Sequence, residues 1–233
     1  MKKILLIATG GTIASTPTEQ GLAPGLSSRE LLETVPELSG VCQIDTLQLF
    51  NLDSTNMCHV QWLAIARTVR EKYEDYDGFL ITHGTDTMAY SASAVTFMLP
   101  NIDLPVVFTG SQLPLSDILS DGPDNLRTAF AMAASGKPGI FLAFDRKVML
   151  GCRAVKVRAS GFSAFESVNA RYAGIVSNRG LVLDEAVLPE RKGDPRLMTD
   201  ISNSVFLLKL TPGMNPAIFD MLCALGYRGI VIE

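Results

Sequence analysis

Hydroxyl and carboxylate side chains in this sequence gather directly behind short apolar runs. Thr12 follows the run ILLIATG and a second glycine, while Asp53, Ser54 and Thr55 end or follow the run DTLQLFNLD. The stretch HGTDT, residues 83–87, follows GFLIT. A threonine hydroxyl becomes an effective nucleophile when a neighbouring group takes its proton. These residues therefore indicate a hydrolase-like pocket built on threonine hydroxyls.

Two side chains are candidates for the base that such a threonine needs. His83 opens HGTDT, although it could equally shape the turn. Lys156, which we expect in a Gly-flanked loop within GCRAVKVRASGF, would complete a Thr-Lys-Asp relay that repeats the nucleophile, base and orienter of serine hydrolases. Simpler interpretations remain open, because Gly-Gly-Thr can be a plain turn, Asp-Ser-Thr a helix cap, and a loop lysine a solvated side chain.

Alternating strand and helix patterns must position these residues. Apolar runs predict strands at 4–10, 45–53, 78–84, 105–111 and 139–145, and helical spacing predicts helices at 27–35, 59–73, 88–99 and 125–134. This alternation predicts an α/β fold, a mostly parallel sheet flanked by helices on both faces. Because the carboxyl ends of parallel strands meet at one edge, Thr12, residues 53–55 and residues 83–87 should line one pocket.

The composition of the chain changes after this region and predicts a second domain. We expect a catalytic N-terminal domain over residues 1–183, a charged and turn-rich linker over 184–203, and the start of a smaller α/β domain over 204–233. The chain stops on the apolar run GIVIE, and a parallel strand buried on both faces needs further cover. We therefore expect the second domain to be incomplete and the sequence to be truncated at its C-terminus.

Charge and composition exclude several classes of partner. The net charge is −4 and no stripe of Lys or Arg occurs, which argues against a nucleic-acid surface. No segment reaches the roughly 20 apolar residues of a membrane span, and MKKILLIA runs into Gly-Gly-Thr rather than a cleavage site. The glycines lack the GxGxxG spacing of a nucleotide loop. We expect a soluble, cytoplasmic protein that acts on a small molecule.

The cysteines and histidines do not predict a metal site. The four cysteines are far apart in the sequence and form no CxxC pair; they are Cys42, Cys58, Cys152 and Cys223. The sequence adds two histidines as further ligand candidates, His59 and His83, which are too few for a structural zinc site. We expect free and mostly buried thiols, as in a reducing compartment.

The motifs taken in order resemble a known family. They are ATGGTIAS, LFNLDSTNM, YDGFLITHGTDTMAYSAS, VVFTGSQLP, DGPDNLRTA, DRKVMLGCRAVKVR and FSAFESVN. Together they resemble the threonine-dependent L-asparaginases of bacteria and archaea, and most of all the cytoplasmic type I branch. The resemblance covers essentially the whole chain, and HGTDT is its most specific part.

The resemblance implies a role for each catalytic residue. Thr12 would attack the side-chain amide of L-asparagine, release ammonia and form an acyl-enzyme intermediate. Thr85, Lys156 and Asp86 would form a second triad, in which Lys156 helps to deprotonate Thr85 for the proton transfers and the attack of water. Asp86 would also bind the α-ammonium of the substrate through a charge-assisted contact.

The resemblance also implies the remaining contacts of the substrate. Ser54, with Asp53 and Thr55 beside it, would hold the α-carboxylate and α-amino ends. Backbone N–H groups near Thr12 and Thr85 would form the oxyanion hole. The family needs no metal and no organic cofactor.

The sequence departs from the family pattern at two places. Most relatives carry a lid tyrosine that contacts the nucleophile, whereas Leu22 stands at that position in STPTEQGLAPGLS. Relatives also continue for roughly another hundred residues, which build a homodimer or homotetramer whose neighbouring protomer completes the pocket. We therefore expect this chain alone to be weakly active or prone to aggregate.

Two other functions stay open. The amidohydrolase component of archaeal-type glutamyl-tRNA amidotransferases shares the HGTDT region, but it carries an extra domain before the Gly-Gly-Thr strand and binds tRNA. A non-catalytic amino-acid-binding relative is favoured by Leu22 and the short C-terminus. The combined presence of Thr12, Thr85, Asp86 and Lys156 argues against it, because binding alone does not require paired hydroxyls and a lysine.

Overall fold

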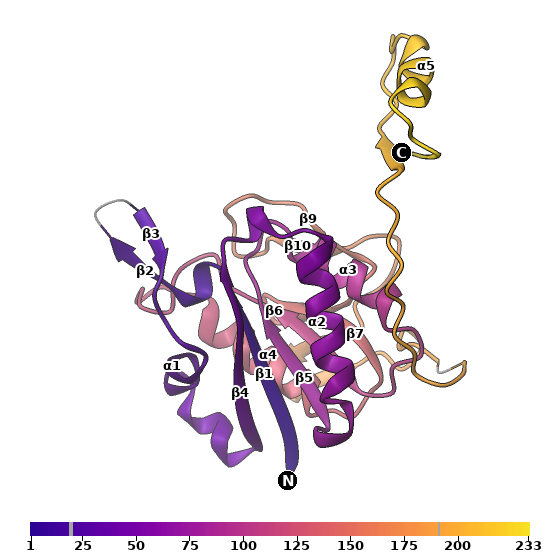
Figure 1. Cartoon of the computed structure of the whole chain (residues 1–233). Helices are drawn as coiled ribbons and strands as arrows, with labels where there is room; N and C mark the ends of the chain where they lie inside the picture. Colours follow the sequence, from indigo (N-terminus) through magenta and orange to yellow (C-terminus); the bar gives the residue numbers. More distant parts are fainter. Residues whose placement is uncertain (19–20, 191) are drawn as a thin grey trace. The chain divides into compact units, whose positions relative to one another are not determined.

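The computed structural model describes residues 1–18, 21–190 and 192–233, and the side chains of residues 16–24 lie outside that description. The described chain forms two compact units, Met1–Met198 and Thr199–Glu233 (Figure 1). The division falls inside the segment 184–203 that the sequence predicts as a linker.

A central sheet organises the first unit. Its strands run in the order β12-β11-β8-β7-β6-β5-β1-β4. The parallel part consists of β1 (Lys2–Gly10), β4 (Cys42–Leu52), β5 (Gly78–Thr82), β6 (Pro105–Thr109) and β7 (Gly139–Phe144). All five strands were predicted from their apolar runs, and they end at the same edge of the sheet. The predicted α/β fold with a mostly parallel sheet is confirmed.

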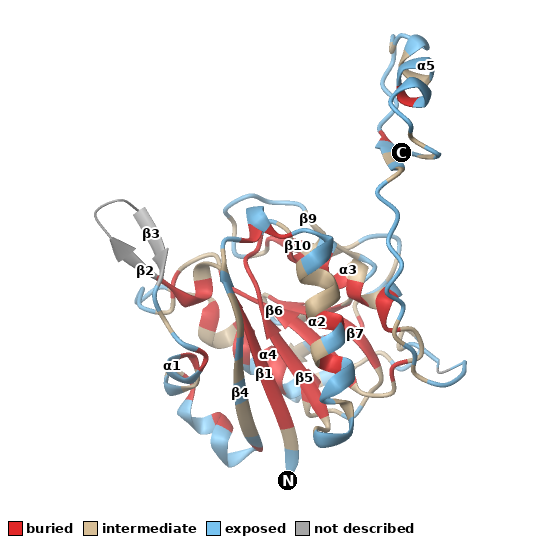
Figure 2. Ribbon diagram, in the orientation of Figure 1, coloured by how far each residue is buried: buried red, intermediate tan, exposed pale blue. Residues whose placement is uncertain are grey.

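Side-chain alternation along the strands builds a core on each face of the sheet. Leu5 and Ile7 of β1 pack with α2 (His59–Glu71) and α3 (Met88–Met98) on one face. Ile4, Leu6 and Ala8 pack with α1 (Ser28–Glu33) and α4 (Gly122–Ala133) on the other. Figure 2 shows the central strands as buried and the outward sides of the helices as exposed. Burial on both faces explains why these strands are continuously apolar.

Antiparallel strands extend the sheet beyond β7 and were not predicted. They are β8 (Lys147–Leu150), β11 (Gly174–Ser177) and β12 (Gly180–Leu183). Two hairpins lie outside the sheet, one of β2 (Ser15–Thr18) with β3 (Gly21–Pro24) and one of β9 (Ala154–Lys156) with β10 (Phe165–Ser167). The expectation that Lys156 lies in a loop is therefore wrong, because Lys156 ends β9 and pairs with Phe165.

The cysteines also differ from expectation. Cys42 is buried, whereas Cys58, Cys152 and Cys223 are exposed. Cys58 caps the start of α2, Cys152 lies in the turn after β8, and Cys223 lies on a helix of the second unit. Helix caps and tight turns lie at the surface, so the apolar character of a thiol does not bury it there.

The second unit is a small α/β element. Strands β13 (Val205–Leu208) and β14 (Gly229–Ile232) pair in parallel, and α5 (Ala217–Ala224) connects them. Phe206 packs edge-on against Tyr227 with the ring centroids 5.2 Å apart. In the described parts of both units, no helix has the length and hydrophobicity needed to cross a bilayer.

Candidate active site

The Gly10-Gly11 turn ends β1 and places Thr12 at the edge of the sheet. Both glycines have positive φ, 102° and 86°, which side chains other than glycine rarely adopt. A Cβ on Gly11 would lie 2.3 Å from Gly84 N, so the turn packs directly against the loop after β5. Thr12 then begins a short 3₁₀ helix, Thr12–Ala14. The glycines thus bring two backbone segments into contact and leave Thr12 at their junction.

The loop after β4 contributes Ser54 to the same junction. Ser54 is buried, and a Cβ on Gly84 would lie 2.6 Å from its Oγ. The backbone carbonyl of Ser54 accepts a hydrogen bond of 2.7 Å from the Thr87 hydroxyl. Asp53 instead accepts 2.9 Å hydrogen bonds from the amide and the hydroxyl of Thr55. Asp53 and Thr55 therefore bond mainly to each other, and Ser54 faces the loop of HGTDT.

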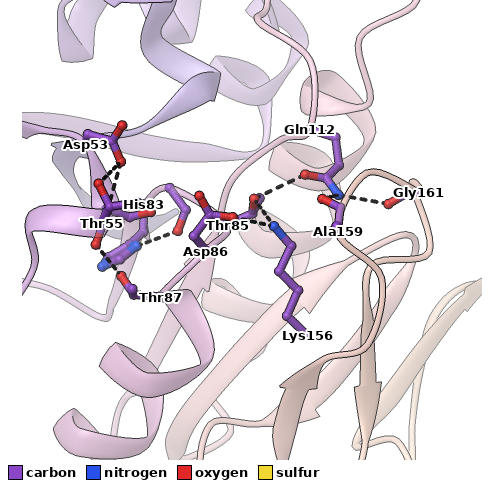
Figure 3. Close-up of polar contacts among 12 residues, drawn as sticks. Asp53, Thr55, His83, Thr85, Asp86, Thr87, Gln112, Lys156, Ala159 and Gly161 are labelled. Carbon is purple, nitrogen blue, oxygen red and sulfur yellow. Dashed lines mark hydrogen bonds and ion pairs between the residues drawn. The ribbon is translucent and has the colours of Figure 1, made fainter.

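Thr85, Asp86 and Lys156 form one hydrogen-bonded group (Figure 3). Lys156 Nζ lies 2.9 Å from Thr85 Oγ1 and 2.7 Å from Asp86 Oδ1. Thr85 is buried and the Lys156 side chain is 14% exposed, whereas the Asp86 side chain is 60% exposed. The ammonium is thus held at the Thr85 hydroxyl by a carboxylate that still reaches solvent.

Gln112 is a further member of this group, and the sequence pattern did not single it out. The Thr85 hydroxyl donates to Gln112 Oε1 at 3.1 Å, while Gln112 Nε2 donates to the carbonyls of Ala159 and Gly161 at 3.2 and 3.0 Å (Figure 3). The sequence signal that could have found Gln112 is its place in VVFTGSQLP, three residues after β6 ends at Thr109. That strand end lies at the same edge of the sheet as Thr12.

The N-terminal end of α4 anchors the turn that carries Gln112. Asp121 accepts from the backbone amides of Gln112 and Leu113, at 2.9 and 3.1 Å. Asn125 donates to Asp121 Oδ2 and to the carbonyl of Gly110, at 3.0 and 2.9 Å. The motif DGPDN therefore acts on the site by fixing this turn.

His83 points into the core and is not a base for the pocket. Its side chain is fully buried, and both ring nitrogens are hydrogen-bonded, Nδ1 with Gly84 O and Nε2 with Ser91 Oγ, each at 2.8 Å. Burial lowers the pKa of His83 to about 4, so the ring is neutral near pH 7. Of the two roles that the sequence left open, the geometry supports shaping of the turn.

A small cavity lies where these loops meet. Its volume is about 160 Å³, and it is lined by Gly11, Thr12, Ser15, Leu52, Asp53, Ser54, Gly84, Thr85 and Asp86. Asp86 also lines a neighbouring cavity of about 550 Å³, together with Lys156 and Tyr90. The structure thus brings Thr12, Asp53, Ser54, Thr85 and Asp86 to one cavity, with Lys156 behind Thr85. Thr55 does not line it.

The arrangement can support attack by a hydroxyl followed by proton transfer. Two threonines line one cavity, and one of them lies next to an ammonium, which can donate or return a proton over a single hydrogen bond. Within the described residues, no group of three or more His, Cys, Asp or Glu side chains is placed to hold a metal ion.

Comparison with known proteins gives matches over nearly the whole chain. The family model "Asparaginase, N-terminal" matches residues 3–188. An L-asparaginase of Thermococcus kodakarensis is 41% identical over 99% of this chain and 70% of its own length. The solved structure of the thermostable L-asparaginase from that organism superposes with a TM-score of 0.88 at 40% identity, again over 99% of this chain and 70% of that one.

Two further relatives match at comparable levels. L-asparaginase 1 of Escherichia coli is 42% identical over 72% of this chain and 51% of its own length. A glutamyl-tRNA(Gln) amidotransferase component from Archaeoglobus fulgidus is 35% identical over 99% of this chain and 57% of its own length. The chain therefore spans between about half and 70% of these relatives, and it belongs to the asparaginase family.

Proposed function

We propose that this protein is an L-asparaginase, an amidohydrolase that converts L-asparagine to L-aspartate and ammonia. The observation that carries the proposal is the meeting of Thr12 and Thr85 at one cavity, with Lys156 bonded to the second threonine and to Asp86. Family membership and the two related L-asparaginases support the same activity.

Thr12 is the proposed nucleophile. Its hydroxyl has no hydrogen-bond partner among the described residues and lies at the cavity wall, so it is free to approach a bound amide. Attack of Thr12 Oγ1 on the amide carbon forms a tetrahedral oxyanion. When that intermediate collapses, the C–N bond breaks, the amide –NH2 takes up the proton that Thr12 gave up and leaves as ammonia, and an ester to Thr12 remains.

Thr85 and Lys156 are the proposed route for protons. Lys156 Nζ contacts Thr85 Oγ1 directly, so a proton can move between the amine and the hydroxyl at the edge of the cavity. In the second half of the reaction, water attacks the ester carbon and one of its protons passes by way of this pair to Thr12 Oγ1. The ester bond then breaks and L-aspartate is released. Asp86 keeps the lysine in place through the 2.7 Å ion pair.

Asp86 and Ser54 are proposed to hold the amino-acid end of the substrate. The carboxylate of Asp86 lines the cavity and remains partly exposed, which suits an α-ammonium. The Ser54 hydroxyl bonds to no other described residue and can donate to the α-carboxylate. Asp53 contributes by fixing the loop through Thr55.

The test is release of ammonia from L-asparagine and L-glutamine by the native protein and by Thr12→Ala. We expect the native protein to release ammonia from asparagine, and Thr12→Ala to lower kcat by about 10⁴-fold or more, the scale seen when a nucleophile is removed. Normal turnover by Thr12→Ala would refute the assignment of the nucleophile. Binding of aspartate without turnover by the native protein would instead support an amino-acid-binding function.

A component of a tRNA-linked amidotransferase is the second candidate function, because the Archaeoglobus protein aligns with 99% of this chain. This candidate predicts that glutamine is preferred and that glutamyl-tRNA stimulates ammonia release. A preference for free asparagine without any response to tRNA would exclude it.

We also infer self-association and a reducing, cytoplasmic location. Tyr90 and Phe97, 65% and 70% exposed, lie two turns apart on the same side of α3, and such apolar exposure favours a protein contact. The four cysteines are free, as in a reducing compartment. Light scattering after gel filtration would reveal a dimer or tetramer, and a monomer at micromolar concentration would contradict the inference.

A further inference from the structure

A chain of hydrogen-bonded groups runs from the half-buried Trp62 through the buried Ser91 and His83 to the loop of HGTDT. Trp62 Nε1 on α2 donates to Ser91 Oγ on α3 at 2.8 Å, and Ser91 Oγ lies 2.8 Å from His83 Nε2. His83 Nδ1 lies 2.8 Å from Gly84 O. The His83 ring also packs edge-on against Phe108 of β6. The proposed mechanism uses none of these side chains.

The partners fix the direction of every hydrogen bond in this chain of groups. The carbonyl of Gly84 can only accept, so His83 Nδ1 must carry a proton. Because burial lowers the pKa of His83 to about 4, the ring is neutral and Nε2 has a free lone pair. The Ser91 hydroxyl therefore donates to Nε2 and accepts from Trp62. One tautomer of the ring satisfies all of these groups at once.

This bond to Gly84 determines which way the next N–H points. In a trans peptide, the C=O of one residue and the N–H of the next point in opposite directions. The Gly84–Thr85 peptide is trans, and its carbonyl is directed at a fully buried ring. The N–H of Thr85 is thus directed away from that ring, and Gly84 and Thr85 both line the cavity with Thr12. Among the described residues, this N–H has no acceptor.

Close contacts around the loop of HGTDT restrict its translation, and rotation of the Gly84–Thr85 peptide is the movement that they leave. A Cβ on Gly84 would meet Ser54 Oγ, and a Cβ on Gly11 would meet Gly84 N. The backbone of His83 is held by a 2.8 Å bond from its amide to Thr109 O. Translation of the loop is therefore blocked on several sides. The bond from His83 Nδ1 to Gly84 O opposes the remaining rotation.

We propose that His83 is a positioning residue whose Nδ1–H bond to Gly84 O aims the Thr85 N–H at the oxyanion formed when Thr12 attacks. The inference rests on the proposed asparaginase function and assigns a role to the histidine of HGTDT. Donors that are oriented before the reaction stabilise developing charge more than donors that must turn toward it. Trp62 and Ser91 act one step further out, by selecting the tautomer of the ring.

Two substitutions separate positioning from mere filling of the core. The side-chain amide of Asn places a nitrogen near the position of Nδ1 in histidine, whereas the longer Gln reaches the position of Nε2. We expect His83→Asn to keep a donor for Gly84 O and to retain kcat within about tenfold. We expect His83→Gln and His83→Leu to lower kcat by about 10²–10³-fold, the scale for a lost oxyanion donor. KM should change less than threefold, because Ser54 and Asp86 still bind the substrate.

The matched control is His59→Gln, which changes the other histidine, an exposed residue at the start of α2, and should leave kcat unchanged. Circular dichroism and thermal melts establish that each variant is folded. The dissociation constant of L-aspartate, a ground-state ligand, should stay within threefold of the native value in every folded His83 variant. The proposal would be overturned if His83→Asn and His83→Gln lost kcat equally, or if the His83 variants raised KM without lowering kcat.

The ring tautomer provides a measurement that does not depend on turnover. Nitrogen-15 NMR of the native protein should show His83 protonated at Nδ1 and not at Nε2. The opposite tautomer would overturn the positioning role even in an active asparaginase. A native protein with the expected tautomer that releases no ammonia would refute the proposed function, and the oxyanion role would fall with it.

Discussion

The two threonines of the site are held in very different ways. Thr85 bonds to Lys156 and Gln112, and its preceding peptide is fixed by His83 and the helices behind it. The Thr12 hydroxyl has no hydrogen-bond partner among the residues that the structure describes. The position of Thr12 comes from the Gly10-Gly11 turn and from the contact of Gly11 with Gly84.

The difference matches the proposed division of labour. A group that passes protons must keep fixed distances to its partners throughout the reaction. A nucleophile must instead move toward the substrate, form a bond and be released again. Three predictions test this comparison by changing the groups that hold Thr85, since each change should alter a measured rate or stability. They are given from the largest expected effect to the smallest.

The largest effect is expected from Lys156→Met. This change removes the partner of Thr85 and leaves Asp86 without its cation, so kcat should fall by about 10³-fold, within the range for loss of an acid or base. Steady-state ammonia release and a single-turnover experiment together locate the defect. The acyl-enzyme should persist longer than in the native protein, since the attack of water depends on this pair.

Lys156→Arg is the matched control for charge, because it keeps a cation beside Asp86 but not the geometry of a single amine. It should bind aspartate about as tightly as the native protein does while remaining slow. Normal turnover by Lys156→Arg would show that the single amine of lysine is not needed. Thr85 would then not require fixed distances to its partners, and it would resemble Thr12 more than proposed.

The second effect concerns the pH dependence of stability. The folded pKa of His83 is about 4, below the ordinary value of 6.5, so the unfolded chain binds a proton that the native state does not bind between these values. The free energy of unfolding should therefore fall by up to about 3 kcal/mol on acidification from pH 6.5 to 4, and His83 should add no slope above this window.

Urea unfolding of the native protein and of His83→Asn at pH 7, 6, 5 and 4 measures this contribution. Asn does not titrate, so the variant should lose less stability than the native protein over the same range. Parallel pH curves for the two proteins would show that the ring is not held neutral, and the support of Thr85 by His83 would be weaker than described.

The smallest effect is expected from Gln112→Met, which has a similar length but no hydrogen bonds. Thr85 loses its acceptor and the carbonyls of Ala159 and Gly161 lose a donor, so kcat should fall by about tenfold with the free energy of unfolding lowered by about 1–2 kcal/mol. Gln112→Glu keeps an acceptor for Thr85 and should retain more activity than Gln112→Met. The reverse order would show that the loop contact, and not the direction of the Thr85 hydroxyl, is what matters.

The sequence predicted the parallel core of the fold because its signals are local. Apolar runs mark β1, β4, β5, β6 and β7, and the helical pattern over residues 27–35 marks α1, which Ser27 caps together with Glu30 in a capping box. The antiparallel strands escaped prediction because β8, β9 and β10 are only three or four residues long and are defined by pairing partners.

The candidate site divides in the same way. Thr12, Ser54, Thr85 and Asp86 could be placed together because each follows a predicted strand of one sheet. Gln112 could not be selected, since its importance depends on where Ala159 and Gly161 pass in space. The role of His83 required knowing which way its ring faces. The side chain of Leu22, which the resemblance to the family places where most relatives carry a lid tyrosine, lies outside the described residues.

The contact between Gly11 and Gly84 has a consequence for the variation that the site tolerates. Main chain touches main chain there, with no room for a Cβ on Gly11 and with the Ser54 hydroxyl where a Cβ of Gly84 would lie. The spacing of the strand ends that carry Thr12 and Thr85 is therefore a property of the backbone rather than of any replaceable side chain. Substrate preference can change through the residues around the cavity while the reactive gap stays constant, so chemistry and specificity can evolve separately in this protein.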